Sequence, residues 1–553
     1  MKNEEVMVGR RLSLFFLLPI LVVAIQAIAA QEVTIPSQTE SWHGSKALLL
    51  PGILRKPSGN GQFPVAVMFS GFTDSQHESS WVDRLTGRGY VALESDSLSS
   101  RRFQNGVRDS TDRVNDHSIS LPALTLKPGN FYFSLNGRPS FIFSRNVAGY
   151  KLTHYYTFLD WAKAGGSKFI RIQLDSMGMG YTSKGGVDHN WVAQWDKVFD
   201  KAREDVIYIL PVFSGWFDWN AGAGYSTWKS NPMNYANGGP VKTPAELFQK
   251  GSATQIMWLD WMQTLVKHWK RRKNIFAWEV FSEVNLASGV NETTGIEFVN
   301  SAVKLIRIAD PSRRPVTASL ADTGNWPNFY RDTSIDFINI HPYPPSMQLD
   351  KNIILNAGNS LARYNRPVLI GESGLSFEGP NKYPPKAEIG VRHAIWAAIV
   401  SGAMNGRALY WEDSFAIYFS NEGMPFVQKY SMKELPSAEF VKGVDFSGFE
   451  PLKSSYSSGV WGAAIGNDKM VLGWFRDSGC EPPNWHMKPL ISKQTVTITL
   501  RGKVNVWRVD FYDTKTGVTI INSTLVTRNG QTITIPLPDF QDDIAFKAYA
   551  EHI

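Results

Sequence analysis

The stretch Ile275-Phe-Ala-Trp-Glu-Val-Phe-Ser-Glu283 is the strongest indication of the fold in this sequence. Most of its residues are apolar, which is typical of a short strand buried on both faces in a parallel sheet. The run ends in a carboxylate, Glu283, where such a strand would leave the core. Because an acidic group there is costly without a partner or a task, Glu283 is a candidate functional residue.

A second stretch of the same kind, Arg366-Pro-Val-Leu-Ile-Gly-Glu372, follows further along the chain. Two buried strands that each end in a glutamate indicate a pair of carboxylates that work together. Strand and helix patterns alternate around them, and strands are predicted near 140–146, 168–174, 206–213, 275–282, 315–320, 335–341, 366–371 and 407–412. This pattern predicts an α/β fold, a (β/α)8 TIM barrel over residues 116–445. A doubly wound open sheet is the alternative, but no Gly-rich phosphate loop follows an early strand.

The segments on either side of the barrel have different patterns. Residues 31–115 contain two predicted strands and read as a short N-terminal α/β fragment. After residue 446 the helical pattern disappears, and short alternating strands with turns such as Asn529-Gly530 indicate a C-terminal β-sandwich domain over 446–553. We expect a structural accessory domain there, with a carbohydrate-binding module as the alternative.

The N-terminal residues 1–30 have the plan of a secretory signal peptide. Two arginines precede an apolar run from Leu12 to Ile25, and Ala27, Ala29 and Ala30 follow it. We therefore expect a secreted or periplasmic protein. A retained membrane anchor is the alternative, because the run is nearly long enough to span a bilayer. Cys480 is the single cysteine, so no disulfide can form within the chain.

Composition limits the classes of partner. The chain has 553 residues, of which 43% are hydrophobic, so it can bury a large core in two or three domains. The net charge of +7 comes from 57 basic and 50 acidic residues spread along the chain. The short basic run 270–273 is expected at a helix C-terminus, where it complements the helix dipole. The sequence gives little support to a nucleic-acid partner.

Polar residues at the predicted strand ends fall into four motifs: Trp278-Glu-Val-Phe-Ser-Glu283, Ile340-His-Pro-Tyr343, Val368-Leu-Ile-Gly-Glu372 and Tyr410-Trp-Glu412. Their order and spacing resemble the retaining glycoside hydrolases of the large (β/α)8 clan that includes cellulases and β-mannanases, glycoside hydrolase family 5 among them. The resemblance implies hydrolysis of β-linked polysaccharide through a covalent glycosyl-enzyme. It implies no cofactor and no metal, and no His/Cys/Asp cluster has the spacing of metal ligands.

The same resemblance assigns roles to the motif residues. It implies that Glu283 is the general acid/base and Glu372 the nucleophile. Retaining hydrolysis uses two carboxyl groups about 5–5.5 Å apart, and their closeness pushes their pKa values apart. Tyr343 is expected to donate a hydrogen bond to Glu372, and Arg171 to keep Glu372 ionised. Further substrate contacts are expected from His341, Trp411, Trp216, Trp219 and Trp326; for the last three, packing is an equal alternative.

Two residues beside Glu283 qualify this interpretation. Many clan members have Asn directly before the acid/base, where its amide contacts the sugar 2-hydroxyl, but this chain has Ser282. The serine hydroxyl is shorter than the asparagine amide and carries fewer donors, so the sequence does not determine which sugar is preferred. Glu279 competes for the acid role, because on a strand it points the same way as Glu283 but one layer deeper. We expect Glu279 to form a buried ion pair, with Arg171 as its partner.

Two other functions stay open. One is a non-catalytic carbohydrate-binding protein on the same scaffold, with Ser282 as the mark of lost activity. The other is an esterase in residues 31–115, where Phe63-Pro-Val-Ala-Val-Met-Phe-Ser-Gly-Phe72 and Tyr90-Val-Ala-Leu93 resemble the opening third of dienelactone-hydrolase-type α/β-hydrolases. Such enzymes need a nucleophile on a Gly-x-Ser-x-Gly or Gly-x-Cys-x-Gly turn, which the chain lacks. The segment is expected to be a remnant or a docking element.

Overall fold

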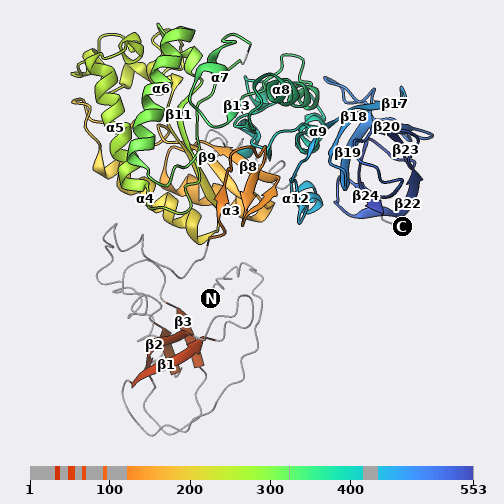
Figure 1. The fold of residues 1–553 in the computed structure, drawn as a ribbon. Helices are drawn as coiled ribbons and strands as arrows, with labels where there is room; N and C mark the ends of the chain where they lie inside the picture. The colour runs from red at the N-terminus through yellow and green to blue at the C-terminus, as the bar shows by residue number, and fades with distance from the viewer. Residues whose placement is uncertain are drawn as a thin grey trace, which may run out of the picture. The chain divides into compact units, whose positions relative to one another are not determined.

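The computed structural model describes residues 31–37, 48–55, 65–69, 91–95, 121–322, 324–414 and 434–551. The chain forms two compact units, Met1–Arg113 and Val114–Ile553 (Figure 1). The predicted signal peptide lies outside the described residues. In the first unit, the described strands form one sheet in the order β1 (Gln31–Ser37), β2 (Leu48–Arg55), β4 (Val91–Ser95) and β3 (Val65–Phe69). β3 and β4, the two strands predicted there, run parallel.

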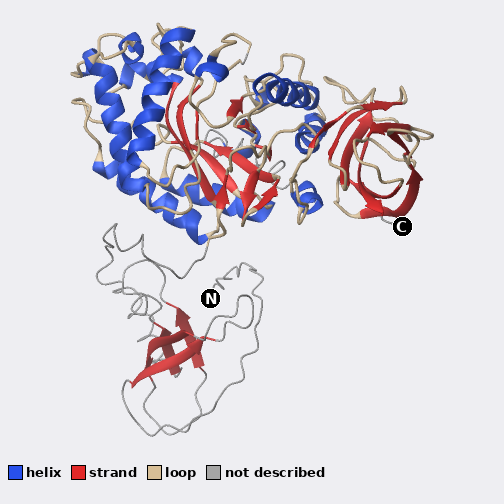
Figure 2. Cartoon of the chain, viewed as in Figure 1, coloured by secondary structure: helices blue, strands red, loops and turns tan. Residues whose placement is uncertain are grey.

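Parallel strands in the described part of the second unit alternate with helices and close into a barrel (Figure 2). Its strands are β8 (Ile142–Val147), β9 (Phe169–Gln173), β10 (Tyr208–Gly215), β11 (Trp278–Ser282), β12 (Val316–Thr317), β13 (Ile338–Ile340), β14 (Val368–Ile370) and β15 (Asn405–Arg407). β15 pairs with β8, and single bridges, Ser319–Asn339 and Ser373–Leu409, join the β13–β14 pair to its two neighbours. The predicted (β/α)8 barrel is therefore confirmed.

Helices cover the outside of the barrel: α3 (Leu152–Gly165), α4 (His189–Glu204), α5 (Ala253–Trp269), α6 (Glu292–Ala309), α7 (Phe329–Asp332), α8 (Leu349–Tyr364) and α9 (Ala387–Ile399). Two further helices, α10 (Trp411–Ser414) and α12 (Leu435–Val441), follow β15. In α5, the Ser252 side chain caps the first turn by accepting from the Gln255 backbone N–H at 3.0 Å. Trp258 and Trp269 on this helix are fully buried. Its regular apolar spacing therefore reflects core packing.

A small antiparallel sheet closes the end of the barrel at which the parallel strands begin. It consists of β5 (Leu124–Thr125), β6 (Phe133–Leu135) and β7 (Arg138–Ser140). Asn136 and Gly137 both have positive φ, 53° and 83°, as a tight hairpin turn requires. This turn places Phe133 against Phe169 and Phe276 of the barrel, with ring centroids 6.0 and 5.2 Å away. The hairpin thus seals the end of the barrel opposite the strand C-termini.

The eighth strand is the one that is displaced from its predicted bounds, whereas β12, β13 and β14 are shorter than predicted but lie within them. The eighth strand was expected at 407–412, but β15 is Asn405–Arg407 and α10 begins at Trp411. Arg407 and Ala408 have φ of 67° and 45°, and this left-handed conformation ends the extended strand. Trp411 therefore sits on a short helix above the barrel instead of on the strand.

The C-terminal region folds as two antiparallel sheets, as predicted for a β-sandwich. The strands of the first sheet lie in the order β16 (Glu450–Leu452), β18 (Val460–Gly466), β19 (Met470–Asp477), β24 (Asp543–Glu551), β21 (Val506–Asp513) and β22 (Thr519–Thr527). The strands of the second sheet lie in the order β17 (Ser454–Tyr456), β20 (Thr495–Thr499) and β23 (Thr532–Pro536). The C-terminal sandwich packs on the barrel through α9. The His393 ring lies 2.9 Å from the Asp542 carboxylate, and Arg392 pairs with Asp543 at 3.0 Å.

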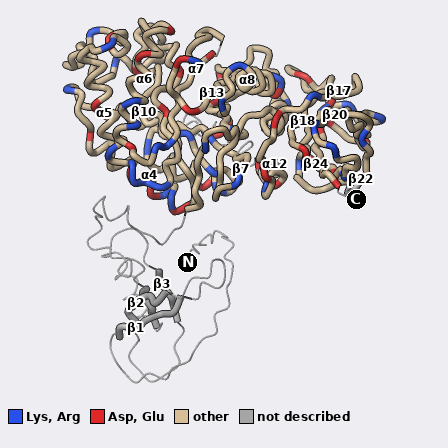
Figure 3. Tube along the Cα trace, in the orientation of Figure 1, with Lys and Arg blue, Asp and Glu red and all other residues tan. Residues whose placement is uncertain are grey.

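Short 3-10 helices lie in the loops: η2 (Trp216–Trp219), η3 (Trp228–Ser230), η4 (Tyr235–Asn237), η5 (Pro244–Phe248), η6 (Val284–Leu286) and η7 (Pro380–Lys382). Basic and acidic residues are interleaved over the barrel and the sandwich (Figure 3). Within the described ranges, no helix has both the length and the apolar character needed to cross a bilayer.

Candidate active site

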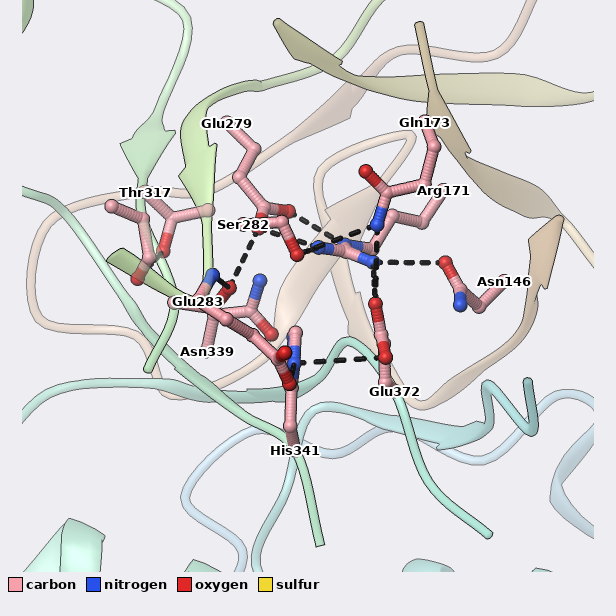
Figure 4. A network of polar contacts seen from close by, with 12 residues as sticks. Asn146, Arg171, Gln173, Glu279, Ser282, Glu283, Thr317, Asn339, His341 and Glu372 are labelled. Atoms are coloured by element: carbon pink, nitrogen blue, oxygen red, sulfur yellow. Dashed lines mark hydrogen bonds and ion pairs between the residues drawn. The ribbon is translucent and has the colours of Figure 1, made fainter. Parts of the chain in front are cut away.

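The C-terminal ends of the strands bring both motif glutamates into one site (Figure 4). Glu283 directly follows β11, Glu372 lies two residues after β14, and His341 directly follows β13. One carboxylate oxygen of each glutamate and one ring nitrogen of His341 lie within 4.8 Å of one another. The parallel arrangement of the strands therefore places three separate sequence motifs around one point.

Glu283 has an unusual backbone. Its φ and ψ are 54° and 56°, the left-handed conformation, and its N–H donates to the Ser319 Oγ at 3.0 Å. A residue other than glycine costs about 1–3 kcal/mol in a sparsely populated conformation of this kind, and such strain is common at functional sites. The turn ends β11 and directs the carboxylate into the site, where 12% of the side chain is exposed.

Glu372 is held by four side chains. Its Oε1 accepts from Arg171 Nη1 at 2.7 Å and from Gln173 Nε2 at 3.2 Å. Its Oε2 accepts from the Tyr343 hydroxyl at 3.0 Å and lies 3.8 Å from His341 Nδ1. Burial alone would raise the pKa of Glu372, but the neighbouring charges of His341 and Arg171 and these hydrogen bonds bring it below its usual value. Glu372 is therefore ionised at neutral pH.

Arg171 connects Glu372 to a buried acid below it. The guanidinium donates from Nε and Nη2 to the two oxygens of Glu279, both at 2.7 Å, and from Nη1 to the Asn146 Oδ1 at 2.9 Å. Glu279 is fully buried. This is the buried ion pair expected from the sequence. Because both Glu279 oxygens face Arg171, Glu283 is the better placed of the two to meet a substrate.

His341 contacts both carboxylates. Its Nδ1 lies 2.9 Å from the Glu283 Oε1. In this hydrogen bond the proton can belong either to the imidazole nitrogen or to the carboxyl group. The ring is fully buried, and its other nitrogen, Nε2, has no hydrogen-bond partner among the described residues. His341 is thus placed to orient the Glu283 carboxyl group and to exchange a proton with it.

The tryptophans singled out in the sequence take different positions. Trp219 is fully buried and packs on Trp228 with ring centroids 5.7 Å apart, which is the packing alternative. Trp216 is mostly buried and stacks on Phe217 at 4.2 Å. The other two are half-buried: Trp326 covers Gly295 of α6, and Trp411 begins α10 against Tyr410. Trp326 and Trp411 keep some exposed ring surface.

Three polar residues of the site were missed in the sequence. Gln173 is two residues after Arg171 on β9, so a period of two along that strand would have placed it on the same face. Asp175 and Asp218 lie on the loops that follow β9 and β10. Burial raises the pKa of Asp175 to about 7, and burial together with the charge of Asp175 raises the pKa of Asp218 well above its usual value. Neither loop has a sequence periodicity that would have indicated Asp175 or Asp218 as residues of the site.

Two clusters of described residues have the geometry to hold a cation: Glu283, His341 and Glu372, and at the sandwich junction His393, Cys480 and Asp542. Each cluster already has guanidinium groups beside it. Arg171 is bonded to the first through Glu372, and Arg392 to the second through Asp542. A cation would be repelled by these charges. Both clusters therefore fit ion-paired protein groups better than a metal ion.

Comparison with known proteins identifies the fold. No family model matches this sequence, and no curated protein matches it. Among solved structures, a glycoside hydrolase superposes with a TM-score of 0.53 at 11% identity, covering 78% of this chain and 97% of its own. A glycoside hydrolase of family 5 from Bacteroides vulgatus has a TM-score of 0.53 at 13% identity, covering 78% and 95%. These likenesses show a shared fold.

Proposed function

We propose that this chain is a retaining glycoside hydrolase that cleaves β-glycosidic bonds of a polysaccharide, of the cellulase or β-mannanase kind. The observation that carries the proposal is the pair Glu283 and Glu372, with carboxylate oxygens within 4.8 Å of each other. Inverting enzymes hold their carboxyl groups about 6.5–9.5 Å apart to admit a water, whereas retaining enzymes hold them about 5–5.5 Å apart. The short separation favours direct attack by a carboxylate.

The two glutamates divide the chemistry by their surroundings. Glu372, kept ionised by its neighbours, attacks the anomeric carbon while Glu283 gives a proton to the leaving oxygen. This forms a glycosyl ester on Glu372. In the second step Glu283 takes a proton from water, and that water displaces the sugar from Glu372 with overall retention of configuration.

Arg171 and Glu279 keep the charge balanced through this cycle. When Glu372 becomes an ester it loses its negative charge, and Arg171 loses part of its pairing. Glu279 still holds Arg171 through two hydrogen bonds of 2.7 Å, so the buried guanidinium is never left without a counter-charge. Tyr343 donates to the Glu372 Oε2, leaving the other oxygen of Glu372 with Arg171 and Gln173.

The barrel and the predicted N-terminal segment support a polysaccharide substrate. In (β/α)8 barrels the active site lies at the strand C-termini, where these glutamates lie. The neighbours reported above are by name glycoside hydrolases. The signal-peptide pattern of residues 1–30 adds export to the proposal. Export would bring the enzyme to polymers that do not enter cells.

The proposal is tested by hydrolysis of β-glucans, mannan and xylan by the wild type, Glu283→Ala and Glu372→Ala. We expect both variants to lose nearly all activity. Azide should restore Glu372→Ala on an activated aryl glycoside and yield a glycosyl azide of inverted configuration. The control is Glu378→Ala, an exposed glutamate on the loop after β14, which should behave as the wild type. A wild type that binds glycans and never cleaves them would instead establish a carbohydrate-binding protein.

A further inference from the structure

A cavity of about 780 Å³, the junction cavity, lies where the sandwich meets the barrel. Its lining comes from Arg138 of β7, from residues 442–450 after α12, and from strands and turns of the sandwich. A Cβ on Gly443 or Gly448 of this lining would lie more than 4 Å from every described atom beyond its chain neighbours, so both border open space. Because β7 closes the end of the barrel where the parallel strands begin, the junction cavity is separate from the candidate active site.

Hydrogen bonds connect the walls of the junction cavity. Arg138 Nη2 donates to the Gly443 carbonyl oxygen at 2.6 Å, which joins the barrel hairpin to the loop after α12. Asn467 Nδ2, in the turn between β18 and β19, donates to the Ser447 carbonyl oxygen at 2.8 Å and joins that loop to the sandwich. The lining is therefore fixed in place, and a ligand would bind it with little loss of chain entropy.

Lys547 of β24 is the most buried cation of the lining, with 9% of the residue exposed. Its Nζ lies 4.8 Å from the centre of the Phe440 ring and 5.0 Å from that of the Tyr512 ring. No hydrogen bond joins this Nζ to another described residue. The charge of Asp510 acts on Lys547, but Asp510 is itself paired with Arg508 at 2.9 Å. A buried ammonium is costly without a full counter-charge, so the space beside Lys547 favours an anion.

Positive charge also exceeds negative charge in the lining as a whole. The lining includes five cations, Arg138, Lys442, Lys469, Arg501 and Lys547, and three carboxylates, Asp445, Glu450 and Asp468. Arg501 already pairs with Glu450 at 2.7 Å, and Lys442 pairs with Glu439 outside the lining at 2.9 Å. The three cations that remain exceed the two remaining carboxylates by one charge. This balance favours a ligand with few negative charges over a dense polyanion.

Asp445 and Asp468 limit the chemistry of the ligand further. Both are exposed residues of the lining, and an ionised carboxylate only accepts hydrogen bonds. They would repel a phosphate group, which carries nearly two charges, and would accept from hydroxyl groups. Met470 and the half-buried Tyr549 add apolar surface of the kind that ligand sites use against a ring face. The lining thus matches a ligand with a carboxylate, several hydroxyl groups and an apolar face.

We propose that the junction cavity is a second carbohydrate site, which binds acidic oligosaccharides whose sugars carry a carboxylate. The ligand carboxylate pairs with Lys547, and the ligand hydroxyls donate to Asp445 and Asp468. One face of a sugar ring lies against Tyr549. The volume is within the range of about 300–1,000 Å³ that ligand sites have. The inference goes beyond the proposed glycosidase activity and does not depend on it, because this site holds a glycan without cleaving it.

The test is isothermal titration calorimetry with two acidic probes, the tetrasaccharides of galacturonic and glucuronic acid, and two neutral ones, cellotetraose and mannotetraose. Every chain also carries Glu283→Ala, so that no probe is hydrolysed. We expect at least one acidic probe to bind roughly tenfold or more tightly than either neutral probe, as a hydrogen bond to a charged group provides. Raising the salt concentration should weaken this binding.

Lys547→Met keeps the length of the side chain, removes its charge and should abolish the preference for the acidic probe. Lys469→Ala changes an exposed lysine of the same lining and should weaken binding of the acidic probe by about two- to fivefold. It provides the test even if Lys547→Met fails to fold, which melting temperatures reveal. The matched control is Lys304→Ala, an exposed lysine on α6, which should leave binding unchanged.

The outcomes that overturn the inference are distinct from those that concern catalysis. Acidic probes that bind no better than neutral ones, or do not bind at all, would refute the site. Binding that persists unchanged in Lys547→Met and Lys469→Ala would place it elsewhere on the chain. Inorganic phosphate that displaces the acidic probe at equal concentration would show an unselective anion site instead. Since no hydrolysis is measured, a chain that cleaves no glycoside would overturn the proposed function and leave this inference standing.

Discussion

Glu279 accepts two hydrogen bonds of 2.7 Å from Arg171, one from Nε and one from Nη2. The pair lies next to Glu372, and less than 2% of either side chain of the pair is exposed. A guanidinium bound at two points has a fixed plane, so the position of Nη1 is set before any substrate arrives. Nη1 is the nitrogen that holds Glu372. Glu279 thus orients Glu372, the proposed nucleophile, through Arg171.

Glu279→Ala should therefore destabilise the fold as well as slow the reaction. Removing one partner of a buried ion pair costs about 3–5 kcal/mol, because the other charge is left unpaired. The measurement is the urea midpoint of unfolding. The comparison variant is Glu439→Ala, which removes the exposed pair with Lys442 and should cost less than about 1 kcal/mol. Equal effects of the two changes would contradict the role given to Glu279.

Tyr343→Phe removes the hydrogen bond from the tyrosine hydroxyl to the Glu372 Oε2. Since this hydrogen bond lowers the pKa of Glu372, its loss should raise that pKa. The proposed reaction needs Glu372 ionised, so the acidic limb of the kcat/KM profile should move to higher pH. The maximum should fall by roughly tenfold or more, as expected for a hydrogen bond to a charged group. An acidic limb that stays in place would show that Tyr343 does not act on Glu372.

His341→Ala removes the partner of Glu283 and should impair proton donation to the leaving group. The loss should be about a hundredfold or more for glycosides with poor leaving groups, because these depend on general acid catalysis. It should be small for 2,4-dinitrophenyl glycosides, whose leaving group needs no proton. The measurement is kcat/KM across a series of aryl leaving groups. A uniform loss over the series would assign His341 to substrate binding instead of to Glu283.

Glu412 makes stability depend on pH. It is fully buried, its Oε1 accepts from the Tyr383 hydroxyl, and its Oε2 has no partner in the part of the chain that is described. Burial raises the pKa of Glu412 from 4.5 to about 7. The folded protein therefore keeps a proton that the unfolded chain releases, and the free energy of unfolding falls as pH rises between these two values.

Glu412→Gln should remove this dependence, because glutamine resembles the protonated acid at every pH. We expect the variant to equal the wild type near pH 4 and to exceed it by up to about 3 kcal/mol above pH 7. Urea midpoints measured from pH 4 to pH 9 test this. Glu378→Gln changes an exposed carboxyl group and should keep the wild-type curve. A Glu412→Gln variant that is less stable at high pH would refute the protonated state.

Much of the barrel could be predicted because its strands are continuous apolar runs, as the stretch ending at Glu283 illustrates. The pairing of Glu279 with Arg171 followed from depth along a strand, since side chains alternate with a period of two. The end of β15 could not be predicted, because the left-handed conformation of Arg407 and Ala408 has no signature in those residue types. Gln173 was missed because its place in the site depends on its hydrogen bond to Glu372, which follows another strand.

Loops gave the weakest predictions, for a physical reason. Trp216 and Trp219 lie close together on one loop, and neither residue type nor spacing distinguishes a ring that packs from a ring that binds sugar. Only the fold shows that Trp219 is fully buried against Trp228. The three-dimensional packing of a loop decides such roles, and a loop lacks the periodicity that reveals buried faces in helices and strands.

The junction between α9 and the C-terminal sandwich has a consequence for the history of this chain. Trp485 rests on Gly390 so closely that a Cβ there would lie 2.5 Å from the ring, and the His393–Asp542 pair is buried in the same interface. A barrel without its sandwich would expose α9 and leave these groups unpaired. The two domains therefore depend on each other to keep these groups buried and paired. Recombination that exchanges the sandwich for another domain would have to replace α9 as well.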